Sequence, residues 1–294
     1  MMTNVRRFFA LYALVLTCCC CPPMRASRVV VDAAGRSVTL PDHVQRIISL
    51  APSVTDDLFH LGAAREVVAV SSYTSYPVEA ARKPSIGSPA APSFEQILAL
   101  HPDIVLATVG INHQETVHVL EQRGIAVFVV NPVGLPGVYQ SLRQIGSAIG
   151  RDREAAALVA SLQARETALR QASADRHPIR IFFPVWHDPV ISIGKPAYLT
   201  DLLQVIGLRS VTDDIAQEWP KVSLEAVLAR DPDMLLVMDS GGSGIEKLRA
   251  LPGWSTLRAI REHKILHTDE RIELPSPVCF DALEELARQV PGGQ

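Results

Sequence analysis

The chain has 294 residues, 48% of them hydrophobic and 20% charged, which is typical of a folded globular protein and excludes a disordered chain. It carries 28 Lys and Arg against 31 Asp and Glu, a formal net charge of −3. Nucleic-acid binding needs clustered basic residues that neutralise phosphates, so this acidic balance argues against a nucleic-acid partner.

The first 26 residues have the pattern of an export signal. Arg6 and Arg7 precede an uncharged, mostly apolar run from Phe8 to Cys21, which ends at Pro22. As a helix this run is too short to span the ~30 Å hydrocarbon core of a membrane, but it suits the apolar part of a secretory signal. We therefore expect residues 1–26 to direct export to the periplasm or to the outer face of the inner membrane.

The sequence leaves the processing of this signal open. Cleavage after Ala26 would give a free protein, lipid attachment at Cys18 or Cys19 would anchor it, and an uncleaved membrane anchor is the third alternative. Four of the five cysteines lie in this segment, so Cys279 is the only one in the body. We therefore expect no internal disulfide.

The next part of the chain alternates short apolar runs with longer amphipathic ones, the pattern of βαβ units. Its strands are almost entirely apolar, as in a parallel sheet that is buried on both faces. We therefore predict an N-terminal α/β lobe at residues 27–135. Its expected strands are 46–50, 67–71, 104–107 and 127–130, and its expected helices are 55–61, 94–100 and 115–122.

A long helical region follows. One helix is expected at 138–149, and a second at 154–172 with Asp152 as its N-cap. The second helix contains no Gly or Pro and is rich in strong helix formers, and it would be about 30 Å long. We therefore predict a helical linker at residues 136–176.

The α/β pattern then restarts, with strands expected at 179–184, 234–238 and 265–268, helices at 199–206, 224–230 and 278–289, and a Gly-rich turn at 241–244. Ser93–Leu106 and Ser223–Leu236 are identical at 7 of 14 positions, and Thr55–Gly62 resembles Thr200–Gly207 in the same order. Such repeats indicate two similar lobes. We predict an α/β fold in which two lobes with mostly parallel sheets are joined by a long linker helix, with a ligand cleft between the lobes and the C-terminal lobe at 177–294.

Motifs of common enzymes are absent from the sequence. There is no Gly-rich dinucleotide or phosphate loop, no nucleophile elbow and no paired-histidine zinc motif, and the nine histidines are scattered. We therefore expect no catalysis, no cofactor and no metal site. An exported α/β enzyme that uses Asp239 or Asp269 is the alternative from another class.

Ligands of open parallel sheets bind beyond the carboxyl ends of the strands. Aromatic residues make up only 5% of the chain, yet several lie at these positions, where they could cover a large planar or apolar ligand. They could equally be anchors between a loop and the core. The candidate ligand-binding residues are Pro52, Ser53, Tyr73, Thr108, Trp186, Trp219, Asp269 and Arg271.

Four segments resemble the helical-backbone class of periplasmic binding proteins, which serve importers of vitamin B12, haem and iron–siderophores. Val31–Pro41 is similar to the opening hairpin of the class and Arg46–Ser53 to its first strand and ligand loop. Ser71–Pro77 and Trp219–Arg230 are similar to the vitamin B12-binding members. The resemblance covers residues 28–290 and implies a monomeric substrate-binding component of an ABC importer.

The resemblance also implies roles for single residues. Tyr73 and Trp219 would contact the corrin of a cobalamin ligand. Glu95 and Glu225 would pair with arginines of the permease subunits, and both lie in the first turn of the repeated helix. An acidic residue in a first turn also stabilises the helix dipole, so the two roles are compatible.

The sequence departs from the vitamin B12-binding pattern at four positions. Pro89 and Thr108 replace two tryptophans, Val278 replaces an arginine, and Ile206 replaces a cysteine of a disulfide. We expect cobalamin or a related corrinoid as the ligand, with haem or a ferric siderophore as the alternative. For an anionic group of such a ligand, Arg271 and Tyr198 are candidates by position.

Overall fold

The computed structural model describes residues 26–238 and 244–291. The predicted export signal lies outside the described residues except for Ala26, and so do Asp239 and most of the predicted Gly-rich turn. Within the described ranges, no helix is both long enough and apolar enough to cross a membrane.

The N-terminal lobe contains a four-stranded parallel sheet in the order β4-β3-β5-β6. An antiparallel hairpin precedes it, and its turn joins the sheet through the amide of Ala33, which donates to the carbonyl of Val129 at 2.9 Å. The elements of this lobe are β1 (Ser27–Val31), β2 (Ser37–Pro41), β3 (Ile47–Ser49), α2 (Pro52–His60), β4 (Val67–Val70), η1 (Ala80–Arg82), α3 (Phe94–Ala99), β5 (Ile104–Thr108), α4 (Gln114–Gln122) and β6 (Val127–Val130).

The C-terminal lobe contains a second four-stranded parallel sheet, in the order β10-β7-β11-β12. The two parallel sheets confirm the predicted fold class. The elements of this lobe are β7 (Ile179–Phe182), β8 (Trp186–His187), β9 (Val190–Ile191), α7 (Tyr198–Gln204), β10 (Leu208–Ser210), α8 (Leu224–Arg230), β11 (Met234–Met238), α9 (Gly244–Ala250), η2 (Trp254–Thr256), α10 (Arg258–Arg261), β12 (Ile265–Thr268), η3 (Glu270–Glu273) and α11 (Val278–Ala287).

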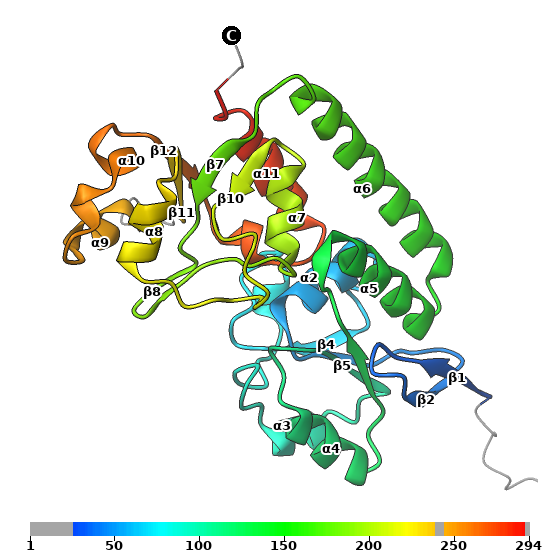
Figure 1. Ribbon diagram of the computed structural model, residues 1–294. Helices are drawn as coiled ribbons and strands as arrows, with labels where there is room; N and C mark the ends of the chain where they lie inside the picture. Colours follow the sequence, from blue (N-terminus) through cyan, green and yellow to red (C-terminus); the bar gives the residue numbers. More distant parts are fainter. Residues whose placement is uncertain (1–25, 239–243, 292–294) are drawn as a thin grey trace, which may run out of the picture.

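Two helices connect the sheets, α5 (Gly134–Ile149) and α6 (Asp152–Ser173), and Figure 1 shows α6 running along the side of the molecule. The part of α5 up to Leu142 packs into the core of the C-terminal lobe, whereas Ile145 and Ile149, nearer its end, pack into the core of the N-terminal lobe. A single continuous helix is thus shared by both hydrophobic cores. Asp152, which the sequence predicted as an N-cap, is instead the first residue of α6.

The predicted repeat is present in the side-chain hydrogen bonds as well as in the element order. Arg46 donates to the carbonyl of Leu100 at the end of α3, and Arg180 donates to the carbonyl of Arg230 at the end of α8. Each arginine lies at the first strand of its own sheet, next to the strand that follows the repeated helix. The two copies therefore hold their repeated helices in the same way.

Candidate functional site

Three aromatic side chains that the sequence predicted to contact a ligand are exposed. Tyr73 is 69% exposed, Trp186 60% and Trp219 42%, whereas Trp254 is buried in the core at 4%. Tyr73 follows β4 in the N-terminal lobe, and in the C-terminal lobe Trp186 follows β7 and Trp219 follows β10. Exposed large rings contributed by both lobes are typical of a binding surface.

The loop that carries Trp219 has a fixed backbone. The amide of Gly194 donates to the carbonyl of Glu218 at 2.9 Å. Gly194 packs so tightly that a Cβ on it would overlap the carbonyl oxygen of Gln217. A depression of about 620 Å³ lies beside the indole and is lined by Gln217, Glu218, Trp219 and Lys221.

Trp186 lies on the β8–β9 hairpin, which the sequence did not predict. Its indole Nε1 donates to the carbonyl of Asp188 at 2.9 Å, so its polar atom is satisfied within the hairpin while the ring stays exposed. Ile191 at the end of the hairpin forms a β-bridge to Lys221. The segments that carry Trp186 and Trp219 are therefore joined. Figure 1 shows β8 on the side of the C-terminal lobe (top) that is nearest the N-terminal lobe (bottom).

Sequence reasoning missed three titratable side chains, one on the Trp186 hairpin, one beside Trp219 and one in η3. Burial and the positive charge of Lys247 lower the pKa of His187. Burial raises the pKa of Glu218, and burial together with the charge of Glu270 raises the pKa of Glu273 to about 7. No motif marks these residues in the sequence, because their pKa values depend on burial by other segments.

Tyr198, a candidate by position for an anionic ligand group, lies in the core. Its side chain is 3% exposed, and its hydroxyl donates to the carbonyl of Ile272 at 2.9 Å. Burial raises its pKa, and the nearby Cys279, Glu273 and Glu218 raise it further. The hydroxyl is therefore engaged within the core and is not presented at the surface.

In the N-terminal lobe, two of the predicted residues begin α2. Pro52 is the first residue of the helix, a position that needs no backbone N–H donor. Ser53 follows it and is 3% exposed. Tyr73 lies in a loop that is tied to the lobe by the amide of Ser72, which donates to the carbonyl of Gly87 at 2.8 Å.

Thr108 lies at the end of β5 and is 2% exposed. Its amide donates to Oδ1 of Asn112 at 2.8 Å. The residue lines a cavity of about 490 Å³ between the hairpin turn and α4, beside Arg36 and Glu121. The structure thus places Thr108 inside the lobe wall, apart from the exposed aromatic rings.

Asp269 and Arg271 form an ion pair with each other after β12. Arg271 Nη2 lies 2.6 Å from Asp269 Oδ2 and 2.6 Å from Glu285 Oε2 of α11. Asp269 also accepts from the amide of Arg271 at 2.9 Å and so caps η3. Two carboxylates already neutralise this guanidinium, and its bond to Asp269 holds the pKa of that carboxyl below its usual value.

Glu95 and Glu225 occupy equivalent places in α3 and α8. Each is exposed and lies in the first turn of a helix that begins after a serine N-cap. The hydroxyl oxygens of Ser93 and Ser223 each accept a backbone amide at 3.3 Å. Bonds from its own amide and from Ser223 lower the pKa of Glu225, so it is ionised at neutral pH.

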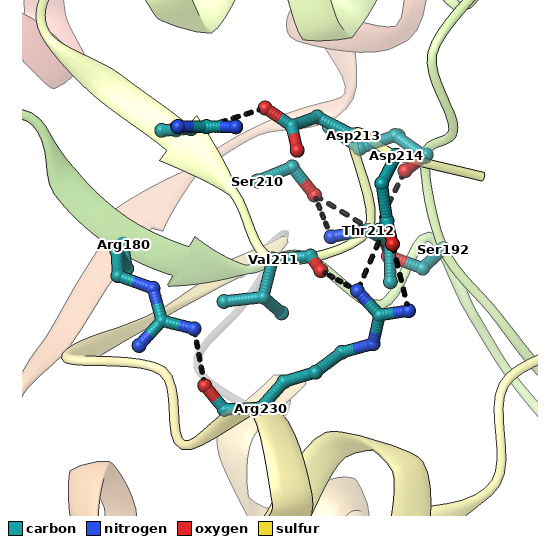
Figure 2. A network of polar contacts seen from close by, with 10 residues as sticks. Arg180, Ser192, Ser210, Val211, Thr212, Asp213, Asp214 and Arg230 are labelled. Carbon is teal, nitrogen blue, oxygen red and sulfur yellow. Dashed lines mark hydrogen bonds and ion pairs between the residues drawn. The ribbon is translucent and has the colours of Figure 1, made fainter.

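The C-terminal end of α8 is tied to the segment that leads to Trp219. Figure 2 shows Arg230 donating to the carbonyl of Val211 at 2.6 Å and to Oδ1 of Asp214 at 2.7 Å. The other end of that segment continues directly into α8. Glu225 and Trp219 therefore lie on one continuous stretch of the C-terminal lobe, whose two ends are tied together by Arg230.

Across the described residues, no three or more His, Cys, Asp and Glu side chains are grouped to hold a metal ion. Asp269 is engaged in its cap and ion pair, and Asp239, the other residue of the enzyme alternative, lies outside the described residues. The described surface features that could bind a ligand or a partner are therefore the exposed aromatic residues on both lobes and the equivalent, exposed Glu95 and Glu225.

Residues 47–272 match the model of a family described as periplasmic binding protein. The chain belongs to this family. The match covers both lobes and the helices between them, and it confirms the resemblance found in the four sequence segments.

Relatives of this binding protein differ in the ligand that their names give. The vitamin B12-binding protein of Salmonella typhimurium is 31% identical over 215 residues, which cover 73% of this chain and 79% of that protein. An uncharacterised ABC transporter substrate-binding lipoprotein of Bacillus subtilis is 27% identical over 268 residues, 88% of this chain and 84% of that protein. A solved structure, the periplasmic heme-binding protein of Roseiflexus sp. RS-1, has a TM-score of 0.74 and 26% identity, and the match covers 83% of this chain and 97% of that one.

Proposed function

We propose that this binding protein captures cobalamin or a related corrinoid and delivers it to the permease of an ABC importer. The observation that carries the proposal is the exposure of Tyr73, Trp186 and Trp219 on the two lobes. A corrin offers a broad apolar ring with polar groups at its edge, which suits aromatic faces surrounded by a few polar side chains. The 31% identity to a vitamin B12-binding protein supports the same ligand.

Of the predicted ligand residues, the three aromatic side chains carry this proposal. Pro52 and Ser53 at the start of α2 would border the ligand from the N-terminal lobe. The proposal gives a minor role to Thr108, because it is buried. It also gives a minor role to Asp269 and Arg271, because they are paired with each other.

Delivery would use Glu95 and Glu225 as the contacts with the permease. Both are exposed, and they are carried on α3 and α8, which Figure 1 shows away from the linker helix α6. One acidic group on each lobe suits a receptor that holds both lobes at once through basic residues. We place the protein in the periplasm or at the outer face of the inner membrane, as a monomer directed there by residues 1–26.

Haem or a ferric siderophore is the second candidate ligand. The observation that favours it is a set of cationic side chains near the tryptophans: Lys221 lines the depression beside Trp219, and Lys247 lies close enough to His187 to lower its pKa. Such groups would pair with the carboxylates of haem. The heme-binding structure from Roseiflexus supports this alternative at 26% identity.

Equilibrium dialysis with competition separates the two ligands. The purified protein is dialysed against cyanocobalamin, whose visible absorbance reports the bound amount, with and without an excess of haemin. The proposal predicts one cobalamin per chain, undisturbed by haemin. Displacement by haemin, or binding of haemin alone, would transfer the function to the second candidate.

A further inference from the structure

Two buried or half-buried aspartates accept hydrogen bonds from the starts of helices at the junction of the lobes: Asp56 binds across from one lobe to the other, and Asp201 binds the shared helix α5. Oδ2 of Asp56, in α2 of the N-terminal lobe, accepts from the amide of Val278 at 3.1 Å. Oδ2 of Asp201, in α7 of the C-terminal lobe, accepts from the amide of Leu135 at 2.9 Å. Val278 is the first residue of α11, and Leu135 is the second residue of α5. Each carboxylate thus binds the start of a helix that follows the last strand of the opposite sheet.

The two aspartates are counterparts in the repeat. Asp56 follows Thr55 and Asp201 follows Thr200, in the pair of segments that resemble each other in the sequence. Both threonine hydroxyls donate to a carbonyl just before their helix, Thr55 to Ala51 at 3.1 Å and Thr200 to Gly194 at 2.7 Å. Each threonine thus ties the helix that carries the neighbouring aspartate to the segment before it.

Neither recipient helix has a cap of its own. The N-cap residues of α5 and α11 are Val133 and Pro277, and neither makes a side-chain cap hydrogen bond. The first amides of a helix have no partner within the helix, and a carboxylate there satisfies a donor and interacts favourably with the helix dipole. Asp56 therefore caps α11 from the other lobe, and Asp201 caps the shared helix α5 from the C-terminal lobe.

Neighbouring residues leave room for one carboxylate and pair with the other. A Cβ on Gly134, at the start of α5, would lie 2.9 Å from Oδ2 of Asp201, so glycine leaves room for the carboxylate. Asp56 is 1% exposed, and Nδ1 of His60 lies 3.2 Å from its Oδ1. Asp281 of α11 also faces His60, so charged groups of both lobes meet at this contact.

We propose that Asp56 and Asp201 are positioning residues that hold the two lobes at one separation and orientation. Moving the lobes apart would leave the start of α11 uncapped and would pull the shared helix α5, which Asp201 ties to the C-terminal lobe, out of one of its two cores. This separation sets the distance between Tyr73 and the two exposed tryptophans. The importance of the two aspartates for ligand capture therefore rests on the proposed function. The hydrogen bonds themselves can be tested without any ligand.

The test compares side chains of similar size that differ in the ability to accept a hydrogen bond. Asp56→Asn and Asp201→Asn keep an acceptor oxygen, whereas Asp56→Leu and Asp201→Leu remove it. Hydrogen exchange of the full chain without ligand is followed by mass spectrometry at residues 278–281 and 135–138. Small-angle X-ray scattering of the same samples reports the separation of the lobes.

Asp56→Leu should speed exchange at 278–281, in the opposite lobe, by about tenfold or more, and Asp201→Leu should do the same at 135–138. The Asn variants should restore most of the protection, and the double Leu variant should have a larger radius of gyration than the wild type. Asp57→Asn, in the same turn of α2, is the control and should leave residues 278–281 protected. The proposal is overturned if the Leu variants leave the opposite helix start protected, if Asn and Leu behave alike, or if the double Leu variant keeps the wild-type radius.

Discussion

Gly194 and Gln217 approach each other so closely that no side chain fits between them: a Cβ on Gly194 would overlap the Gln217 carbonyl oxygen. The contact fixes the backbone two residues before Trp219. Gly194→Ala should therefore displace this loop and cost roughly 1–3 kcal/mol of unfolding free energy, the usual range for overpacking. Chemical denaturation measures this cost. Lys195→Ala, a change at the exposed neighbouring residue, is the control and should leave stability within about 0.5 kcal/mol of the wild type.

Trp219→Ala should weaken ligand binding without weakening the fold. The ring is 42% exposed and makes no side-chain hydrogen bond that the fold depends on, so its loss should change unfolding free energy little. Loss of one aromatic face against a large ring system should reduce affinity for cyanocobalamin by roughly tenfold to a hundredfold. Calorimetric titration and thermal unfolding of the same sample separate the two effects. A large fall in melting temperature with unchanged affinity would mean that the ring serves the core instead.

Glu95→Gln and Glu225→Gln should abolish or strongly reduce uptake while leaving ligand capture intact. Both side chains are exposed and neither is among the proposed ligand-binding residues, so removing one charge should act on permease contact. Uptake by whole cells and ligand titration of the purified variants measure the two steps. Glu115→Gln is a matched control, because Glu115 also lies in the first turn of a helix. Normal uptake by the double variant of Glu95 and Glu225 would contradict their assigned role.

The stability of the protein should fall as pH rises through about 7, in part because of Glu273. Burial raises the pKa of this carboxyl from 4.5 to about 7 in the folded state. A raised folded pKa means that its contribution is fully present below about 4.5 and is lost as the group ionises near 7. Glu273→Gln should remove this loss and stabilise the protein at pH 8 by up to about 3 kcal/mol, with little gain at pH 4. Urea unfolding at both pH values checks this, with Glu115→Gln, at an exposed glutamate of the other lobe, as the control; equal gains at both pH values would contradict it.

Where local sequence determines structure, the sequence predicted the elements closely. The bounds of α8, β6 and β11 agree residue for residue with the prediction, because each is a helical or apolar run closed by turn residues. Helix α5 begins four residues before its predicted start, and Pro136 lies in its first turn, where proline is tolerated. The β8–β9 hairpin was missed because strands of two residues carry no detectable alternation.

The candidate site was predicted less completely, because its decisive contacts join residues far apart in the chain. The exposure of the predicted aromatic residues agrees with a ligand surface. The pairing of Arg271 with Glu285 and the contact of Asp56 with Val278 depend on how separate elements pack, and no spacing in the sequence shows them. The same holds for Thr108, whose burial follows from the packing around the end of β5.

The central claim, capture of a corrinoid between aromatic surfaces of two lobes, is tested most directly by tryptophan fluorescence. Purified protein is titrated in parallel with cyanocobalamin, haemin and a ferric siderophore, each with the wild type and with Trp219→Ala. The account predicts saturable quenching by cyanocobalamin at one ligand per chain, weakened in the variant, since two of the three tryptophans are exposed. Saturation by haemin or the siderophore alone would contradict the corrinoid assignment, and no saturable quenching by any of the three would contradict capture of a metal chelate altogether.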